Sequence, residues 1–428
     1  MRRGTLTFIL AGFLILGFSA ALPGNPSWAE EAQPARGSGS ADGLPKAHDD
    51  LEVFLEEAEW NALWARVKEG DEEAAARLFV WMRRVEESLT KFSAEEIGVT
   101  PRQLMKIQFI LGGVYLEGIG TPIDGERAAY WFRKSAENGY APAQLALASL
   151  HEEDSLTWTQ KAAEQGYAEA QIRLGIMYGL GDDVPRDEEK AVFWYRKAAE
   201  QGEAHAQYLL GQKYRAGEGG LPQNDEEAAR WYEKAAEQGH EIAQAELGAK
   251  FSMGTGVPQS DEKAAFWYEK AAKQGNVDAQ YLLGAMYAEG RGVPQNDRKA
   301  AFWTRKAAEQ GDIFAQFSFA RMHENGRGIP QSGKEAAHWY RNAATRGYAP
   351  AQLALGMLYE KGTGLPRDLV LAYAWFALAR QTGDDEAILA YRRVEKLLTR
   401  EQLASAKRLV EEGEFALFSE KGEGEEDE

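Results

Sequence analysis

The stretch AQYLLGAMYAEGRGVPQNDRKAAFWTRKAAEQG, from Ala279 to Gly311, decides the fold, because close copies of it fill most of the chain. Its Gln280 recurs at intervals of 36 residues, with one interval of 37 and one of 27. The recurring glutamines are Gln108, Gln144, Gln171, Gln207, Gln244, Gln280, Gln316 and Gln352. A period in this range indicates an array of structural repeats that bury their core between neighbours.

Each copy divides into two helices joined by a turn. Leu283, Gly284 and Tyr287 follow Gln280 at three, four and seven positions, which is the spacing of one helical face. A Gly-x-Gly pair and a proline then break this first helix. Residues suited to cap a second helix follow at Asp124, Asp187, Asn224, Ser260, Asn296, Ser332 and Asp368. The sequence therefore predicts an all-α protein, an α/α solenoid (superhelix) of stacked helix-turn-helix repeats.

A tryptophan in each second helix and a glycine eight residues later complete the pattern. We expect the tryptophans to lie in the core between helices. The closing glycines are Gly139, Gly166, Gly202, Gly239, Gly275, Gly311, Gly347 and Gly383. Because none is replaced, we expect a left-handed backbone with positive φ at all eight. The glycine four residues after each glutamine becomes alanine at Ala148 and Ala320, which indicates that this position needs only a small side chain.

One copy is shorter than the others. Between Gln144 and Trp158, nine residues of turn and cap are missing around the sequence HEEDSLTW. Asp154 or Ser155 is the expected substitute cap. We predict a tighter connection between the two helices of this copy and a local change in the superhelix.

Composition limits the possible partners. Hydrophobic residues make up 44% of the 428 residues, which is enough for a substantial core. The formal net charge of −18 argues against nucleic acid and anionic membranes as general partners. The sequence contains no cysteine, which excludes disulfides, thiol catalysis and thiolate metal sites.

The N-terminal residues are typical of an export signal. Met1-Arg2-Arg3 is basic, Thr5 to Phe18 is apolar but short for a membrane span, and small-residue cleavage patterns follow. We predict that residues 1–29 are a signal peptide and that the mature protein is periplasmic, without stable membrane insertion. The alternative is an uncleaved segment that anchors the protein in the inner membrane.

Composition also suggests boundaries for the remaining segments. Residues 30–49 are expected to be a flexible linker, and residues 50–100 a degenerate N-terminal helical cap. Residues 101–383 hold eight repeats, residues 384–415 form C-terminal capping helices, and residues 416–428 form an acidic disordered tail.

The pattern AQxxLGxxYxxGxGVPxxxxxAxxWxxKAAEQG resembles the Sel-one-like repeat family, a relative of the tetratricopeptide repeats. Residues 371–413 also resemble the closing segment of bacterial members. The resemblance implies an α-solenoid scaffold that binds proteins, and it supplies no catalytic positions. Bacterial members include periplasmic regulators and factors for envelope polysaccharide assembly. A cysteine-rich branch handles penicillin-like ligands, and the lack of cysteine here speaks against that activity.

No arrangement of residues indicates catalysis, a metal site or a cofactor. His151 and His323 occupy a helix position that holds Tyr or Phe in other copies, so we interpret them as packing residues. Sequences such as Gly254-Thr255-Gly256 follow helices and belong to turns. We therefore expect a protein that is not an enzyme. The alternative is an envelope hydrolase, or a protein that binds a small ligand such as peptidoglycan or a β-lactam.

Functional residues are sought where the copies differ. Two and five residues after the glutamine, the side chains vary and face the same way, because they are three apart on a helix. First helices of a solenoid line its concave surface, so we expect a protein partner to be recognised there. Lys213 and Lys250, which lie near these variable positions, add positive charge. The predicted partner-binding residues are Arg173, Gln212, Lys213, Glu246, Lys250 and Arg321. Simple solvent-exposed variation is the alternative.

Overall fold

The computed structural model describes residues 65–67, 69–91, 93, 99–150 and 154–412. The predicted signal peptide, linker and acidic tail lie outside these residues. Residues 50–64, 68, 92 and 94–98 of the predicted N-terminal cap and residues 413–415 of the predicted C-terminal cap also lie outside them.

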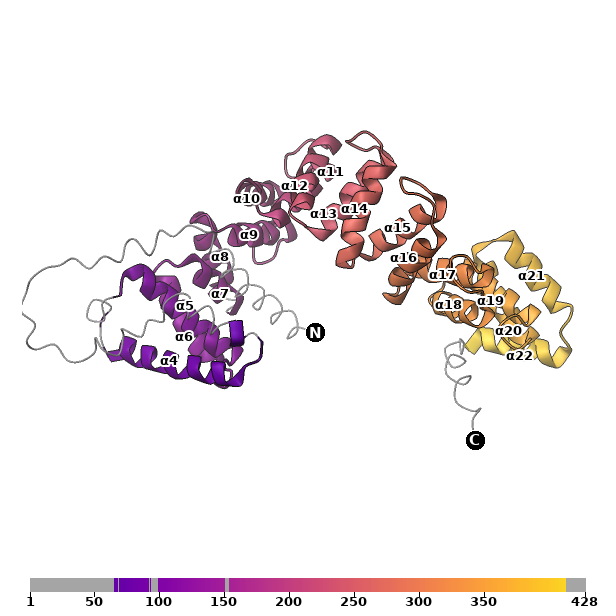
Figure 1. Cartoon of the computed structure of the whole chain (residues 1–428), viewed down its shortest axis with the longest axis horizontal. Helices are drawn as coiled ribbons and strands as arrows, with labels where there is room; N and C mark the ends of the chain where they lie inside the picture. Colours follow the sequence, from indigo (N-terminus) through magenta and orange to yellow (C-terminus); the bar gives the residue numbers. More distant parts are fainter. Residues whose placement is uncertain (1–64, 68, 92, 94–98, 151–153, 413–428) are drawn as a thin grey trace, which may run out of the picture. The chain divides into compact units, whose positions relative to one another are not determined.

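The described residues form an all-α structure of stacked helix pairs, which confirms the predicted fold class (Figure 1). The first helices of the repeats are α5 (Pro101–Glu117), α7 (Ala141–Leu150), α9 (Ala168–Leu180), α11 (Ala204–Ala216), α13 (Glu241–Met253), α15 (Val277–Glu289), α17 (Ile313–Asn325) and α19 (Ala349–Lys361). The second helices are α6 (Gly125–Glu137), α8 (Ser155–Glu164), α10 (Glu188–Glu200), α12 (Asp225–Glu237), α14 (Asp261–Gln274), α16 (Asp297–Glu309), α18 (Gly333–Thr345) and α20 (Leu369–Ala379).

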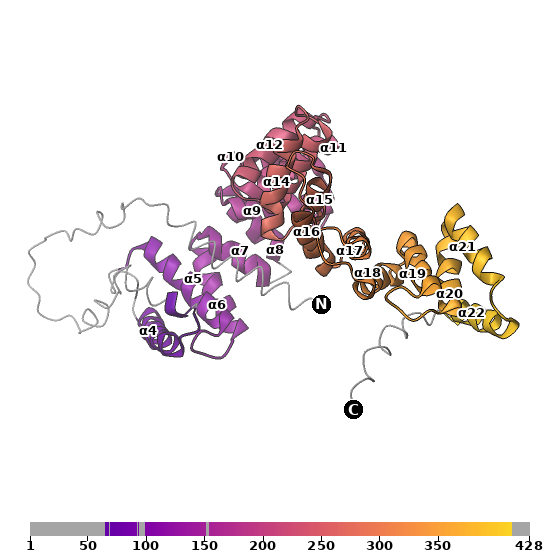
Figure 2. The ribbon, with the colours of Figure 1, turned by 45° about the vertical axis from the view of Figure 1, so that its right-hand side comes forward.

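Further helices lie before and after the repeats. They are α4 (Glu72–Lys91), the 3₁₀ turn η2 (Arg380–Thr382), α21 (Asp385–Glu395) and α22 (Arg400–Glu412). The chain divides into two compact units, Met1–Ala206 and Gln207–Glu428. Within each unit the main packing contacts join helices that follow one another in the chain, and α20 also contacts α22 (Figures 1 and 2).

The helix ends follow the chemistry that the sequence predicts. All seven expected caps accept a hydrogen bond from a backbone N–H of their helix; Asn296 accepts one from the amide of Lys299 at 3.0 Å. Asp154 stands at the cap position of α8 but makes no such bond. All eight closing glycines have φ between 80° and 111°, which confirms the expected left-handed backbone.

In five repeats the glycine inside the first helix leaves room for a ring of the paired second helix, whereas Gly284 faces Thr304. A Cβ atom at Gly248 would lie 2.7 Å from the Tyr268 ring, and one at Gly356 would lie 2.5 Å from the Phe376 ring. These rings belong to the residue after each tryptophan. The tryptophans themselves are less uniformly covered, because Trp131, Trp267 and Trp375 are buried and the other five are half-buried.

The second glycine of each turn brings successive repeats into contact. In unit Gln207–Glu428, a Cβ atom at Gly256, Gly292 or Gly328 would lie 2.1 Å from a backbone oxygen at the start of the preceding second helix. No side chain fits at that distance. All three glycines also have positive φ. Glycine is therefore required here for both backbone conformation and close approach.

The recurring glutamine builds a buried hydrogen-bond relay. Gln280 donates to the carbonyl of Ala272 in the preceding repeat at 3.1 Å and accepts from Gln310, at the end of the second helix of its own repeat, at 2.8 Å. Gln310 also donates to the carbonyl of Gly275 at 3.1 Å. The bond from the later glutamine recurs between Gln274 and Gln244, and in the other unit between Gln201 and Gln171. The glutamines therefore satisfy buried polar groups while joining neighbouring repeats.

The last repeat is closed by aromatic packing. Tyr373 of α20 and Tyr391 of α21 are buried, their ring centroids lie 4.6 Å apart, and their hydroxyl groups are hydrogen-bonded. The Arg380 guanidinium lies 3.9 Å from the Tyr391 ring centroid. Together with α22, these residues cover the apolar end of unit Gln207–Glu428.

Candidate functional site

Arg173 of α9 lies in unit Met1–Ala206, where it spans the shortened repeat. Its guanidinium donates to the carbonyl of Ala148 at 3.2 Å, to the hydroxyl of Ser155 at 3.3 Å, and to the hydroxyl of Ser149. Burial lowers the pKa of Arg173. These bonds join α7, α8 and α9, so Arg173 already stabilises the contact among these three helices.

The two predicted lysines are also engaged within the protein. Lys250 of α13 has a side chain only 6% exposed and forms an ion pair with Asp225 at the start of α12. Lys213 of α11 pairs with Glu218 at 2.7 Å, in the turn that follows the same helix. The charge of each lysine is thus compensated inside unit Gln207–Glu428.

Glu246 and Gln212 lie in the same part of this unit. Glu246 of α13 pairs with Arg215 of α11 at 3.3 Å, and this contact joins two successive first helices. Gln212 donates to the hydroxyl of Tyr208 at 2.6 Å. Four of the six predicted residues therefore lie on α11 and α13, whereas Arg173 belongs to the other unit and Arg321 lies on α17.

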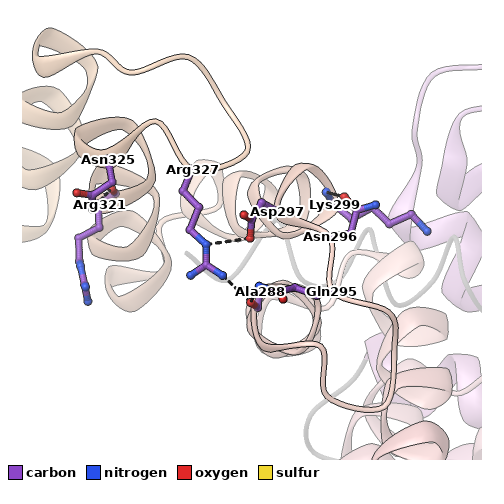
Figure 3. A network of polar contacts seen from close by, with 8 residues as sticks. All are labelled: Ala288, Gln295, Asn296, Asp297, Lys299, Arg321, Asn325 and Arg327. Carbon is purple, nitrogen blue, oxygen red and sulfur yellow. Dashed lines mark hydrogen bonds and ion pairs between the residues drawn. The ribbon is translucent and has the colours of Figure 1, made fainter.

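Arg321 differs from the other five residues. Its side chain is exposed and forms no ion pair within the described part of the chain. Figure 3 shows its guanidinium directed away from the nearby Arg327–Asp297 pair, which has a distance of 2.8 Å. The side-chain amide of Asn325 donates to the backbone carbonyl of Arg321 at 2.9 Å, and this bond does not involve the guanidinium. That the six residues contact a partner stays a prediction. Among them, Arg321 is the residue whose charged group is exposed and available to a partner.

Aromatic side chains gather beside Arg321 on the first-helix side of the repeats. Phe314 is 53% exposed, and its ring centroid lies 5.5 Å from that of Tyr348 and 6.4 Å from that of Tyr281. Phe317 lies 5.3 Å from Tyr348, and the Arg321 guanidinium is 5.9 Å from the Phe317 ring centroid. We call Tyr281, Phe314, Phe317, Arg321 and Tyr348 the α17 patch. Its aromatic members lie outside the two first-helix positions from which the sequence predicts partner contacts.

α17 also contains two buried polar atoms without a partner in the described structure: Gln316 Oε1 and His323 Nδ1. Arg346 stands where earlier repeats have a glutamine, and it donates to the carbonyl of Gly311 but not to Gln316. His323 occupies a slot that holds a tyrosine in neighbouring repeats, and burial lowers its pKa. This helix therefore departs from the repeat pattern more than its neighbours do.

A second set of exposed rings lies on the second helices. Phe266 and Phe302 of unit Gln207–Glu428 are 52% and 45% exposed, and each packs edge-on against the tryptophan that follows it. The ammonium of Lys270 lies 4.7 Å from the Phe266 ring centroid. Tyr130 and Phe193 occupy the same position in unit Met1–Ala206. These ring contacts stay within single helices, whereas the ring contacts of the α17 patch join residues of successive repeats.

No cluster of three or more possible metal ligands occurs among the described residues. The helices that the structure describes are all too short or too polar to cross a bilayer.

An open pocket of about 560 Å³ lies beside Met357, and the ion pair between Glu360 and Arg393 at 2.6 Å forms part of its lining.

A family model, the Sel1 repeat, matches residues 108–140, 152–167, 168–203, 204–240, 242–276, 277–312, 313–348 and 349–384. The chain belongs to the Sel1 repeat family. Proteins built from Sel1 repeats generally mediate protein–protein interactions, and the repeat scaffold is generally non-catalytic.

Solved structures of family members resemble this chain over most of its length. A Sel1 repeat protein from Oxalobacter formigenes is 30% identical; the match covers 86% of this chain and 99% of that protein, with a TM-score of 0.51. A protective antigen of uropathogenic Escherichia coli is 28% identical, with 86% and 98% covered and a TM-score of 0.39. None of the curated proteins matches the chain significantly.

Proposed function

We propose that this Sel1 repeat protein is a scaffold of the bacterial envelope that binds a partner protein on the surface of its first helices. The observation that supports this most directly is the α17 patch, where the exposed ring of Phe314 is held in place by half-buried aromatic neighbours. They lie beside an arginine that has no ion pair among the described residues. Ordered aromatic rings and arginine are the side chains that contribute most to protein interfaces. Because the rings are already positioned, binding immobilises few side chains.

We propose export to the periplasm from the composition of residues 1–29, with an uncleaved membrane anchor as the alternative. The test is fractionation of cells that naturally produce the protein. The full chain is expected in the periplasmic fraction with its N-terminus shortened, whereas a chain lacking residues 2–29 is expected in the cytoplasm. Recovery of the full-length chain with inner membranes after a salt wash would favour the anchor.

The binding surface is tested by light-activated cross-linking in the same cells. p-Benzoylphenylalanine is placed singly at Ser318 or Met357 on first helices, and at Lys270 or Phe302 on second helices. The first-helix positions are expected to capture the same envelope protein, and the second-helix positions are expected not to capture it. Capture from the second helices alone would reject the proposed surface. Unchanged circular dichroism verifies that each variant folds.

A further inference from the structure

The α17 patch combines an apolar anchor point with a cation. Phe314, Phe317 and Arg321 are separated by three and four residues, so they lie on one face of α17. The exposed ring of Phe314 contacts the rings of Tyr281 and Tyr348, which come from the neighbouring repeats. A large apolar side chain of a partner would bury this ring without first ordering it.

Arg321 determines the second property of the partner. A segment that covers Phe317 also covers the guanidinium that lies 5.9 Å from the ring centroid. A buried charge without a partner is costly, and arginine pairs best with a planar carboxylate. The acidic residues of the same helix are engaged elsewhere: Asp312 caps α17, and Glu324 accepts a hydrogen bond from Tyr340 at 2.6 Å. The carboxylate must therefore come from the partner.

The other cations of this surface provide a contrast. Lys213, Lys250 and Arg215 pair with Glu218, Asp225 and Glu246 within unit Gln207–Glu428. Arg173 of the predicted set also lacks an ion pair, but it is half-buried and donates to neutral acceptors, so Arg321 is the exposed cation of the set without such compensation among the described residues. In a chain of net charge −18, an uncompensated arginine on this surface selects acidic partner segments locally.

Two uncompensated buried atoms support a special role for this helix. Gln316 Oε1 and His323 Nδ1 have no hydrogen-bond partner in the described structure, although the same repeat frame satisfies the equivalent glutamine oxygen at Gln280. Departures from an otherwise consistent pattern concentrate at functional positions. α17 thus carries two of these unsatisfied atoms together with the exposed ring and the exposed arginine of the α17 patch.

We propose that the α17 patch binds an extended protein segment with a large apolar side chain on Phe314 and an Asp or Glu carboxylate on Arg321. This inference rests on the proposed function, because it specifies the partner of the same surface. Phe314 and Arg321 are seven residues apart, which is about 10 Å along a helix. About three residues of extended chain cover this distance. The segment therefore carries its carboxylate two to four residues from its apolar anchor.

The experiment places p-benzoylphenylalanine at Phe314 of the full chain, in the cells that naturally produce it, and identifies the captured peptide by mass spectrometry. The matched control carries the same group at Phe302, a ring of similar exposure on α16. The expected peptide belongs to another protein and has an acidic residue two to four positions from a large apolar one. Arg321→Gln is expected to lower capture at least about tenfold, whereas Arg298→Gln, at an exposed arginine of α16, leaves it unchanged.

The other outcomes separate this inference from the proposed function. A captured peptide without a carboxylate in that window, capture that is insensitive to Arg321→Gln, or capture of a second copy of this chain rejects the acidic partner segment. Capture at Ser318 or Met357 but not at Phe314 also rejects it, and leaves the first-helix surface in place. Failure of all three positions to capture a protein rejects both proposals.

Discussion

Gln316 shows how closely a single residue depends on the repeat frame. Its side chain donates to the carbonyl of Ala308 at 3.3 Å, as the other relay glutamines do, yet its own oxygen accepts nothing among the described residues. The cause is Arg346, which replaces the glutamine found at Gln310 one repeat earlier. A buried acceptor without a donor lowers stability.

Replacing Arg346 by glutamine is expected to stabilise the protein. The new side chain would donate to Gln316 Oε1 and to the carbonyl of Gly311, as Gln310 does to Gln280 and Gly275. The expected gain is about 1 kcal/mol in the free energy of unfolding, measured by urea denaturation. The reverse change, Gln310→Arg, is the control and is expected to cost a similar amount. Two variants as stable as the natural chain would refute the relay as an energetic element.

His323 predicts a dependence of stability on pH. Burial lowers its pKa, while Glu335 and a hydrogen bond with the backbone of Pro330 act in the opposite direction, and its ring packs on Phe319 with centroids 4.7 Å apart. The folded protein therefore favours the neutral ring. Stability from this residue is complete above the ordinary histidine pKa of about 6.5 and is lost as the pH falls below it.

The change His323→Phe removes this titration, and phenylalanine already occupies the equivalent position at Phe251. Between pH 7.5 and pH 5, the natural chain is expected to lose more stability than the variant. Because the remaining histidines titrate in both proteins, the difference between their unfolding free energies isolates His323. An identical loss in both proteins would show that its protonation costs nothing.

At the scale of the element, the turn after each first helix fixes the spacing between repeats. Gly292 has φ of 68°, and a Cβ atom there would lie 2.1 Å from the carbonyl oxygen of Asp261. Gly311 also has positive φ, of 91°, but a Cβ atom there would have Arg346 Nη1, at 3.8 Å, as its nearest neighbour. The two glycines therefore separate the cost of backbone conformation from that of a clash.

Gly311→Ala is expected to cost about 1–2 kcal/mol, from the left-handed backbone alone. Gly292→Ala adds a clash with fixed backbone, and we expect a total loss of about 3 kcal/mol or more. Thermal or urea unfolding of both variants measures the difference. Equal losses would mean that the repeats separate at this turn without cost.

The sequence predicts the elements of this fold well, because their ends are specified locally. The caps, the closing glycines and the helix pairs all depend on residues within a few positions of one another. The α17 patch depends instead on side chains from three successive repeats, so a comparison of equivalent positions does not reveal it. Lys250 illustrates the same limit, because its burial beside Asp225 comes from a helix of the preceding repeat.

The burial of the residue that follows each tryptophan is harder to predict for a different reason. Tryptophan is the largest side chain and the most regular in the pattern, so it suggests the centre of the core. In the structure the following residue, such as Tyr232 or Tyr340, is almost completely buried against the small residue of the first helix. Helical direction, rather than size, decides which of two adjacent side chains faces inward.

At the scale of the whole molecule, packing is confined to successive elements. Apart from the contact between α20 and α22, the main interfaces of each unit join helices next to each other in the chain. Stability in such an array is a sum of repeat terms and nearest-neighbour terms. A local defect therefore raises the population of openings that include the damaged interface, and leaves distant openings unchanged.

Gly292→Ala tests this property by amide hydrogen exchange. The substitution damages the contact between the turn after α15 and the start of α14, so exchange is expected to accelerate in α13 to α17. The helices α5 to α8 belong to the other compact unit and are expected to exchange at their natural rates. Gly311→Ala, with its smaller cost, provides the control for a purely local backbone effect. Equal acceleration throughout the chain would show that the units unfold as one cooperative body, since only then does every opening include the damaged turn.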